Sequence, residues 1–188
     1  FGPDDCMILW VGRMQLDNDE QPYKGFKELL ALMPRVAARL ERARFVLAGR
    51  VSETDQRRLE GEGLTVLANL PAEDLACALS AADFLINLSL WEGFNLAPLE
   101  AQFQGTPVIL YDIGPHPEIV RRDETGLLVG TPEEFVEAIV RVANNRDLRA
   151  RLATASRSFA EQFTWARSVE KLEGLISASE HPLAMKAA

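Results

Sequence analysis

The stretch "FLINLSLWEGFNLAPLEAQFQGTPVILY", residues 84–111, is the most informative part of the sequence about the fold. It opens with the apolar run 84–89 and closes with the apolar run 107–111, and a short helical pattern starts near Leu96 and ends at Gly105. Continuous rather than alternating apolar runs are typical of strands covered on both faces. A strand, a helix and a second strand in this order predict a right-handed βαβ unit.

The rest of the chain repeats this alternation. Further strands are predicted at 6–12, 44–49, 64–68 and 126–129, and helices at 25–41, 54–61, 72–81, from Pro132 onward, at about 147–160 and at 165–178. Such an order favours an α/β fold, a Rossmann-like doubly wound parallel sheet. We expect one domain over residues 1–178 and a disordered tail over 179–188, where the periodicity ends.

Composition and charge exclude some classes of function. The 188 residues fit one domain, and their 47% apolar and 26% charged content is that of a globular protein. The net charge of −8 argues against a nucleic-acid partner, because a phosphate backbone needs a basic surface. The sequence has neither an apolar run of membrane length nor a signal segment. We interpret Cys6 and Cys77 as buried free thiols, which suits a reducing compartment. We therefore expect a cytoplasmic protein.

Two glutamates mark the loop after the strand at 84–89. Glu92 lies in a turn, and Glu100 lies one turn into the following helix. The backbone amides from Asn95 to Ala97 then form an anion site, because the first N–H groups of a helix have no partner within it. Each glutamate alone is also compatible with an ordinary surface acid. Together they predict a ligand with phosphate at its centre and hydroxyl-rich groups at both ends, which is the shape of a nucleotide sugar.

Two cations follow neighbouring elements. Arg13 comes directly after the first strand, and Lys24 precedes the next helix, so both are candidates for the same cleft, although each also fits ordinary surface charge. His116 is interpreted as a loop histidine. We find no residue spacing typical of a metal site or of a Ser–His–Asp triad, and "VGRMQLD" lacks the GxGxxG of dinucleotide-binding domains.

The chain resembles the carboxyl-terminal, donor-binding domain of GT-B glycosyltransferases of the family 4 type. The matching stretches are "LWVGRM", "YKGFKELLALMPRV", "RFVLAG", "ADFLINLSLWEGFNLAPLEAQFQGTPVI", "PEIVRRDETGLLV" and "FTWARSVEKL". The resemblance implies one half of a GT-B fold and retaining, metal-independent transfer of a sugar from a nucleotide-diphospho-sugar to a glycan or lipid. It implies no cofactor.

The resemblance also implies roles for individual residues. Arg13 and Lys24 are expected at the donor diphosphate, Glu92 at the donor sugar and Glu100 at the nucleotide ribose. Arg13, Lys24 and Glu92 form the expected catalytic set. The expected donor-binding set is Gly12, Arg13, Lys24, Glu92, Gly93, Phe94, Asn95, Leu96 and Glu100.

The chain departs from the family pattern in three ways. The link "MQLDNDEQPY" before Lys24 is longer and more acidic than usual, and Asn95 replaces the usual glycine and adds a side chain against the sugar. We also expect the amino-terminal acceptor domain to be absent from this chain, so that the helix at 165–178 has an exposed apolar stripe and the isolated domain is inactive. This hypothesis is compatible with association of the whole protein with the inner face of the membrane through that missing half. The alternative function is a non-catalytic nucleotide-sugar-binding or docking module of a larger polysaccharide-assembly protein.

Overall fold

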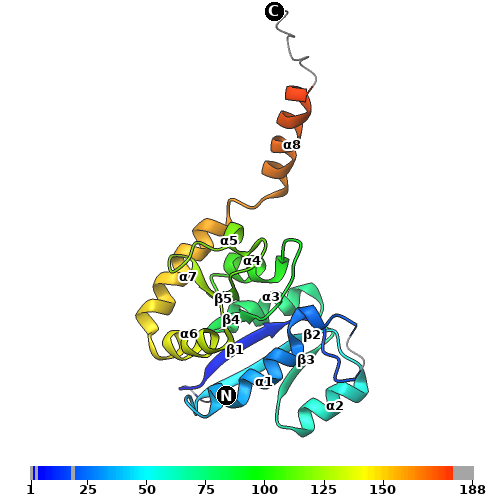
Figure 1. Cartoon of the computed structure of the whole chain (residues 1–188), viewed down its shortest axis with the longest axis vertical. Helices are drawn as coiled ribbons and strands as arrows, with labels where there is room; N and C mark the ends of the chain where they lie inside the picture. The colour runs from blue at the N-terminus through cyan, green and yellow to red at the C-terminus, as the bar shows by residue number, and fades with distance from the viewer. Residues whose placement is uncertain (1, 3, 18–19, 180–188) are drawn as a thin grey trace, which may run out of the picture.

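In a computed structural model, residues 2, 4–17 and 20–179 are described, and they form a six-stranded parallel sheet. The strand order is β3-β2-β1-β4-β5-β6, and Figure 1 shows the sheet between two layers of helices. The strands are β1 (Cys6–Val11), β2 (Ala43–Gly49), β3 (Thr65–Ala68), β4 (Phe84–Asn87), β5 (Val108–Tyr111) and β6 (Gly126–Val129). All six strands predicted from the apolar runs are confirmed.

The helices follow the predicted pattern closely. They are α1 (Phe26–Ala37), α2 (Glu53–Gly61), α3 (Ala72–Ala81), α4 (Leu96–Phe103), α5 (His116–Ile119), α6 (Pro132–Asn144), α7 (Arg146–Ala160) and α8 (Trp165–Ser179), and a single 3₁₀ turn, η1 (Pro22–Lys24), precedes α1. The predicted N-terminus of α6 is confirmed, because the Thr131 hydroxyl accepts a hydrogen bond from the Glu134 amide at 3.1 Å. Gly105 ends α4 with a φ of +78°.

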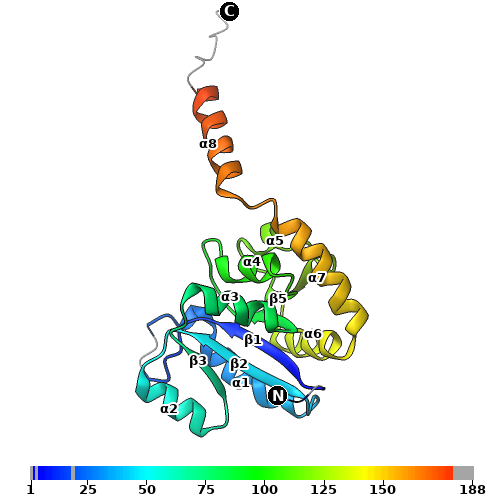
Figure 2. The same cartoon turned by 180° about the vertical axis from the view of Figure 1, so that it is seen from behind.

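Alternate residues of each strand enter two separate cores, as the period of two requires. In β1, Ile8 and Trp10 pack with α1 and α6 on one face, whereas Leu9 packs with α3 and α4 on the other. Figures 1 and 2 show these two helical layers from opposite sides. Both faces of the sheet are therefore covered, which explains why the strands are continuously apolar.

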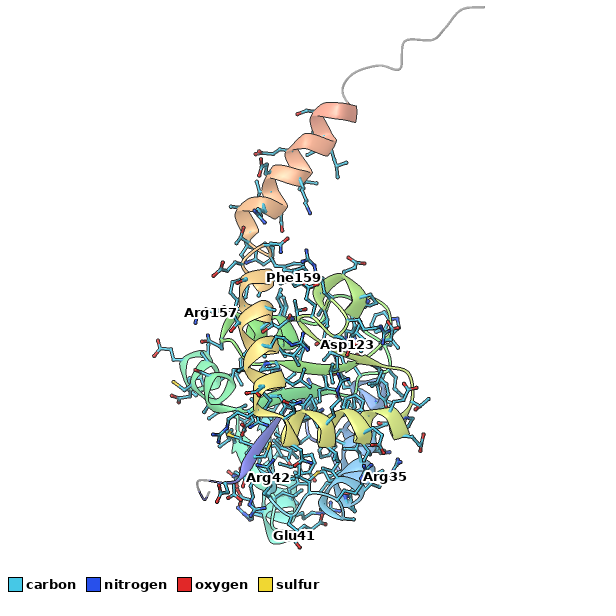
Figure 3. The ribbon with its side chains drawn as sticks, turned by 90° about the vertical axis from the view of Figure 1, so that its left-hand side faces the viewer. Arg35, Glu41, Arg42, Asp123, Arg157 and Phe159 are labelled. Atoms are coloured by element: carbon cyan, nitrogen blue, oxygen red, sulfur yellow. The ribbon has the colours of Figure 1, made fainter. Side chains whose placement is uncertain are left out.

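An ion pair from α1 and a hydrogen bond from the segment after it join this part of the chain to α6. The Arg35 guanidinium lies 3.1 Å from Glu133, and Arg42 donates to the carbonyl of Ala143 at 2.5 Å. Arg35 and Arg42 are labelled at the lower end of the molecule in Figure 3. Because Arg42 directly precedes β2, this contact fixes the end of α6 at the amino edge of the sheet, opposite the carboxyl edge where ligands bind in such folds.

Helix α8 extends away from the rest of the molecule (Figures 1 and 3). As expected, its apolar stripe is exposed: Trp165 is 85% exposed, and Val169, Leu172, Leu175 and Ile176 are at least half exposed. The helix continues to Ser179, and the rest of the predicted tail lies outside the described residues.

One prediction about the cysteines is wrong. Cys6 is buried, and burial raises the pKa of its thiol to about 11, but Cys77 is exposed on α3. Its apolar neighbours Ala78 and Leu79 face the core, which turns Cys77 toward solvent.

Candidate functional site: a cavity at the β1/β4 switch point

The carboxyl ends of β1 and β4 lie side by side at the point where the strand order reverses. β1 pairs with β2 on one side and with β4 on the other, so the connections after β1 and β4 lead in opposite directions. A cavity of about 460 Å³ opens there. It is lined by Val11, Gly12, Arg13, Gln21, Lys24, Asn87, Ser89, Glu92, Phe94, Asn95, Leu96 and Ala97. Crevices of this kind are where doubly wound sheets bind ligands.

Seven of the nine predicted donor-binding residues line this cavity. They are Gly12, Arg13, Lys24, Glu92, Phe94, Asn95 and Leu96. Gly93 and Glu100 are not among its lining residues. Glu100 is exposed on α4, four residues after Leu96 and three after Ala97, so it lies on the same helix face one turn farther from the cavity.

Gly12 is a glycine because the chain is crowded at this point. A Cβ atom at Gly12 would lie 2.5 Å from the Trp10 indole, and one at Gly49 would lie 1.9 Å from the Gly12 carbonyl oxygen. The Trp10 ring is itself buried against Phe26, with the ring centroids 5.5 Å apart. The backbone after β1 is thereby held at the bottom of the cavity, with no room for a side chain.

Lys24 and Glu92 form an ion pair across the cavity. The Lys24 ammonium donates to both carboxylate oxygens of Glu92, at 2.8 and 2.9 Å, and only 6% of the Glu92 side chain is exposed. The sequence predicted Lys24 at a phosphate and Glu92 at a sugar. In the structure each is the other's partner, which offsets the cost of burying the carboxylate.

Backbone contacts fix the two loops that carry this pair. The Leu90 amide donates to the Tyr23 carbonyl at 2.7 Å, and the Tyr23 and Trp91 rings meet edge to face at 5.8 Å. Gly25 has a φ of +75° and approaches the Leu88 carbonyl so closely that a Cβ atom would lie 2.1 Å from its oxygen. Lys24 and Glu92, which are 68 residues apart, therefore meet through main-chain packing.

Arg13 is paired with the acidic link that follows it. Its guanidinium donates to the Glu20 carboxylate at 3.1 Å, and the Glu20 side chain is 70% exposed. A pair this exposed contributes little to stability. Arg13 can therefore exchange Glu20 for an anionic ligand at small cost.

The first turn of α4 supplies backbone donors to the same cavity. Leu96 and Ala97 begin this eight-residue helix and line the cavity, and no side chain of the described residues caps its N-terminus. The unpaired N–H groups and the helix dipole favour an anion here. Arg13 and this helix end thus place positive charge around one part of the cavity.

Sequence reasoning missed three residues that organise the site, namely Asn87, Ser89 and His116. Asn87 Oδ1 accepts from the Ser89 amide and from Asn95 Nδ2, both at 3.1 Å, and Asn95 Nδ2 also lies 2.8 Å from His116 Nε2. His116 is fully buried and not a loop histidine. Burial lowers the pKa of His116, although its contact with the Tyr111 carbonyl and the charges of Glu92 and Asp112 oppose that effect. The sequence offered one sign of these residues: Asn87 is a polar residue at the end of an otherwise apolar strand.

Neither a metal centre nor a membrane span is evident. Within the described ranges, no group of three or more His, Cys, Asp or Glu side chains could hold a metal ion. In the same part of the chain, no helix combines the length and the apolar character that crossing a bilayer requires.

The fold and the site define a Rossmann-like domain of the kind that forms the carboxyl-terminal half of GT-B glycosyltransferases. The family model of glycosyl transferases group 1 matches residues 5–145, and the chain belongs to this family. D-inositol 3-phosphate glycosyltransferase of Corynebacterium glutamicum is 30% identical over 186 residues, which cover 90% of this chain and 42% of that protein. The chain thus spans less than half the length of this relative.

Solved structures show the same fold. Sucrose-phosphate synthase from Thermosynechococcus elongatus superposes with a TM-score of 0.78 at 27% identity, over 95% of this chain and 47% of the synthase. Anabaena HepE, solved in complex with UDP and glucose, gives a TM-score of 0.75 at 18% identity, over 93% of this chain and 49% of HepE.

Proposed function

We propose that this chain is the donor-binding half of a retaining glycosyltransferase, which transfers a sugar from a nucleotide-diphospho-sugar to a glycan or lipid acceptor. The observation that carries the proposal is the cavity at the β1/β4 switch point, where Arg13, the Lys24–Glu92 pair and the first turn of α4 meet. Membership of the group 1 family and the UDP and glucose bound to HepE support a ligand of this kind.

Each residue has a task that follows from its chemistry. Arg13 and the α4 amides hold the diphosphate, since a guanidinium and a helix N-terminus both favour phosphate oxygens. Lys24 has three N–H groups, so it can keep one bond to Glu92 and turn another toward the phosphate. Glu92 then accepts from the sugar hydroxyls, and Glu100 from the ribose hydroxyls.

The transfer step needs stabilisation of negative charge. The bond from the anomeric carbon to the phosphate oxygen breaks, the sugar passes through an oxocarbenium-like state, and its electron pair stays on the diphosphate. The acceptor oxygen bonds to the same face of the anomeric carbon, and its proton leaves with the diphosphate. Arg13, Lys24 and the α4 amides stabilise the growing charge as an oxyanion hole does, in place of a divalent metal.

The acceptor side belongs to the other half of a full-length enzyme. Because this chain spans 42% of its Corynebacterium glutamicum relative, we propose that a separate domain binds the acceptor and completes the cleft. The domain alone then binds donor without turnover. The exposed apolar stripe of α8 favours a second candidate, a non-catalytic docking module of a polysaccharide-assembly protein.

Calorimetric titration with UDP, GDP, ADP and dTDP tests the proposal. We expect one nucleotide to bind, and Arg13→Ala to weaken its binding by about 10- to 100-fold, since hydrogen bonds to charged groups contribute about 1.5–3 kcal/mol. Glu100→Gln should weaken it as well, through the ribose. Arg146→Ala is the matched control, because Arg146 is exposed at the start of α7, at the opposite edge of the sheet.

The two candidates predict different results. A folded domain that binds none of the four nucleotides would contradict donor binding and favour the docking module. Equal weakening by Arg13→Ala and Arg146→Ala would show that the binding site lies elsewhere.

A further inference from the structure

We infer that Asn95 is a specificity-determining residue that presents only its carboxamide oxygen to the donor sugar. The inference rests on the proposed function and goes beyond it, because it assigns a hydrogen-bond role to one side chain of the cavity. Asn95 lines the cavity and has a φ of +75°, a conformation that favours glycine. Asparagine tolerates this conformation better than most residues, and here its side chain also makes two contacts.

The first contact fixes Asn87. The Ser89 backbone N–H can only donate, and it lies 3.1 Å from Asn87 Oδ1, so that atom is the carboxamide oxygen. The same oxygen lies 3.1 Å from the nearest side-chain atom of Asn95. Because an oxygen cannot donate, Asn95 must turn its NH₂ group toward Asn87.

The second contact fixes His116. The Tyr111 carbonyl can only accept, and it lies 2.6 Å from His116 Nδ1, so the proton of the neutral ring is on Nδ1. The ring is fully buried, and burial favours this neutral form. Nε2 is then an acceptor, and it takes a hydrogen bond from Asn95 Nδ2 at 2.8 Å.

Both hydrogens of the Asn95 NH₂ group are therefore used inside the protein. Its Oδ1 accepts no hydrogen bond from the described residues, and Asn95 is only half-buried, which leaves this oxygen available to a ligand. Two backbone groups, the Ser89 amide and the Tyr111 carbonyl, thus decide the orientation of Asn95 through Asn87 and His116. Asn87 and His116 act as positioning residues.

The free oxygen selects a class of ligand group. A carboxamide oxygen accepts from a hydroxyl or an N–H group, and it repels the oxygens of a phosphate. Asn95 and Glu92, whose carboxylate is a second acceptor, line the same cavity, and Arg13 provides a cation for the diphosphate. Asn95 therefore favours donors whose sugar carries a hydrogen-bond donor at the position that faces it, and disfavours the deoxy or O-methyl analogue.

Binding titrations separate the sugar from the nucleotide. Wild type, Asn95→Gly and Asn95→Asp are titrated with the nucleoside diphosphate that the wild type binds and with the glucose, galactose and N-acetylglucosamine conjugates of that nucleotide. For the sugar conjugate that the wild type binds most tightly, we expect Asn95→Gly to weaken binding by about three- to tenfold, the effect of one neutral hydrogen bond. Affinity for the nucleoside diphosphate should change less than twofold.

A magnetic-resonance measurement tests the orientation without any ligand. The sequence contains one other histidine, so a His181→Gln background leaves a single imidazole to follow by its ¹⁵N shifts. We expect the Nδ1–H form in the otherwise wild-type chain and a raised His116 pKa in Asn95→Asp, because a carboxylate would face Nε2 and favour its protonation. A side chain that only supports the loop would not raise this pKa.

The outcomes distinguish the two proposals. A wild type that binds no nucleotide overturns both the proposed function and this inference. Nucleotide binding with an unchanged preference for the sugar conjugate in Asn95→Gly overturns the inference alone. The Nε2–H form of His116 would also overturn it, since Asn95 would then present its NH₂ group to the cavity.

Discussion

At the scale of single residues, the main surprise is how a buried histidine is used. His116 is one of two histidines in the sequence. It starts the short helix α5 and contacts Asn95, which lines the candidate donor site. Its two ring nitrogens bond to the Tyr111 carbonyl and to Asn95. A polar ring with both nitrogens satisfied can be buried at little cost, whereas the same ring with a positive charge cannot.

This burial predicts a pH dependence of stability. The pKa of His116 is lowered in the fold from 6.5, so the unfolded chain binds a proton more readily. The stability that depends on a neutral ring is fully present above the pKa of His116 in the unfolded chain. It is lost as the pH falls below that pKa and through the lower pKa of the folded protein. Urea unfolding at pH 7.5 and pH 5.5 should show a larger loss for wild type than for His116→Asn. An equal loss in both proteins would contradict a role of His116 in this pH dependence. The carboxylates far from His116 titrate alike in both proteins, so they cannot cause a difference between them.

At the scale of elements, the two loops that form the site are held by close main-chain packing. The turn before α1 contacts the segment after β4 at Gly25, whose absent side chain lets the Leu88 carbonyl approach. The Lys24–Glu92 pair lies directly beside this contact. Separating the loops would therefore disturb both the stability of the fold and the geometry of the site.

Two glycine substitutions measure this packing. Gly25 and Gly63 both have positive φ, +75° and +82°, but only Gly25 has a neighbour where a Cβ atom would lie. Gly63→Ala should cost about 1–2 kcal/mol for the backbone conformation alone. Gly25→Ala should cost at least about 3 kcal/mol, since the Leu88 backbone must also move. Urea unfolding compares the two, and similar losses would argue against the close approach.

At the scale of the whole molecule, the compact sheet and its helices carry the core, and α8 stands outside it (Figures 1 and 2). The chain leaves the compact part after α7, close to Phe159 in Figure 3. The apolar residues of α8 are exposed, so they contribute little to the stability of this chain by itself.

Two leucines, one in the core and one on α8, test whether α8 contributes to the stability of the domain. Leu152 on α7 is fully buried, and Leu172 on α8 is 57% exposed. Leu152→Ala should destabilise the domain by about 2–5 kcal/mol, the range for a large core side chain replaced by alanine. Leu172→Ala should change the free energy of unfolding by less than about 0.5 kcal/mol. A large effect of Leu172→Ala in a dilute monomer would mean that α8 packs on the domain.

The strands, the helices and the loops that form the site could all be predicted from the local apolar pattern of the chain. A strand covered on both faces must be apolar at every position, so the six runs could be recognised locally, and the loops after β1 and β4 follow from them. Seven of the nine candidate donor residues line the cavity for the same reason.

Which side chains meet at the cavity could not be predicted in this way, because it depends on how the chain folds. Lys24 bonds to Glu92 across 68 residues, and Asn95 bonds to His116 across 21 residues. Neither residue of either pair carries a local sign of its partner, because the partner is set by the strand order and by the approach of Gly25 to Leu88. The period of apolar residues is a local property and can be read along the chain, whereas a polar contact depends on distances that exist only after the sheet has formed.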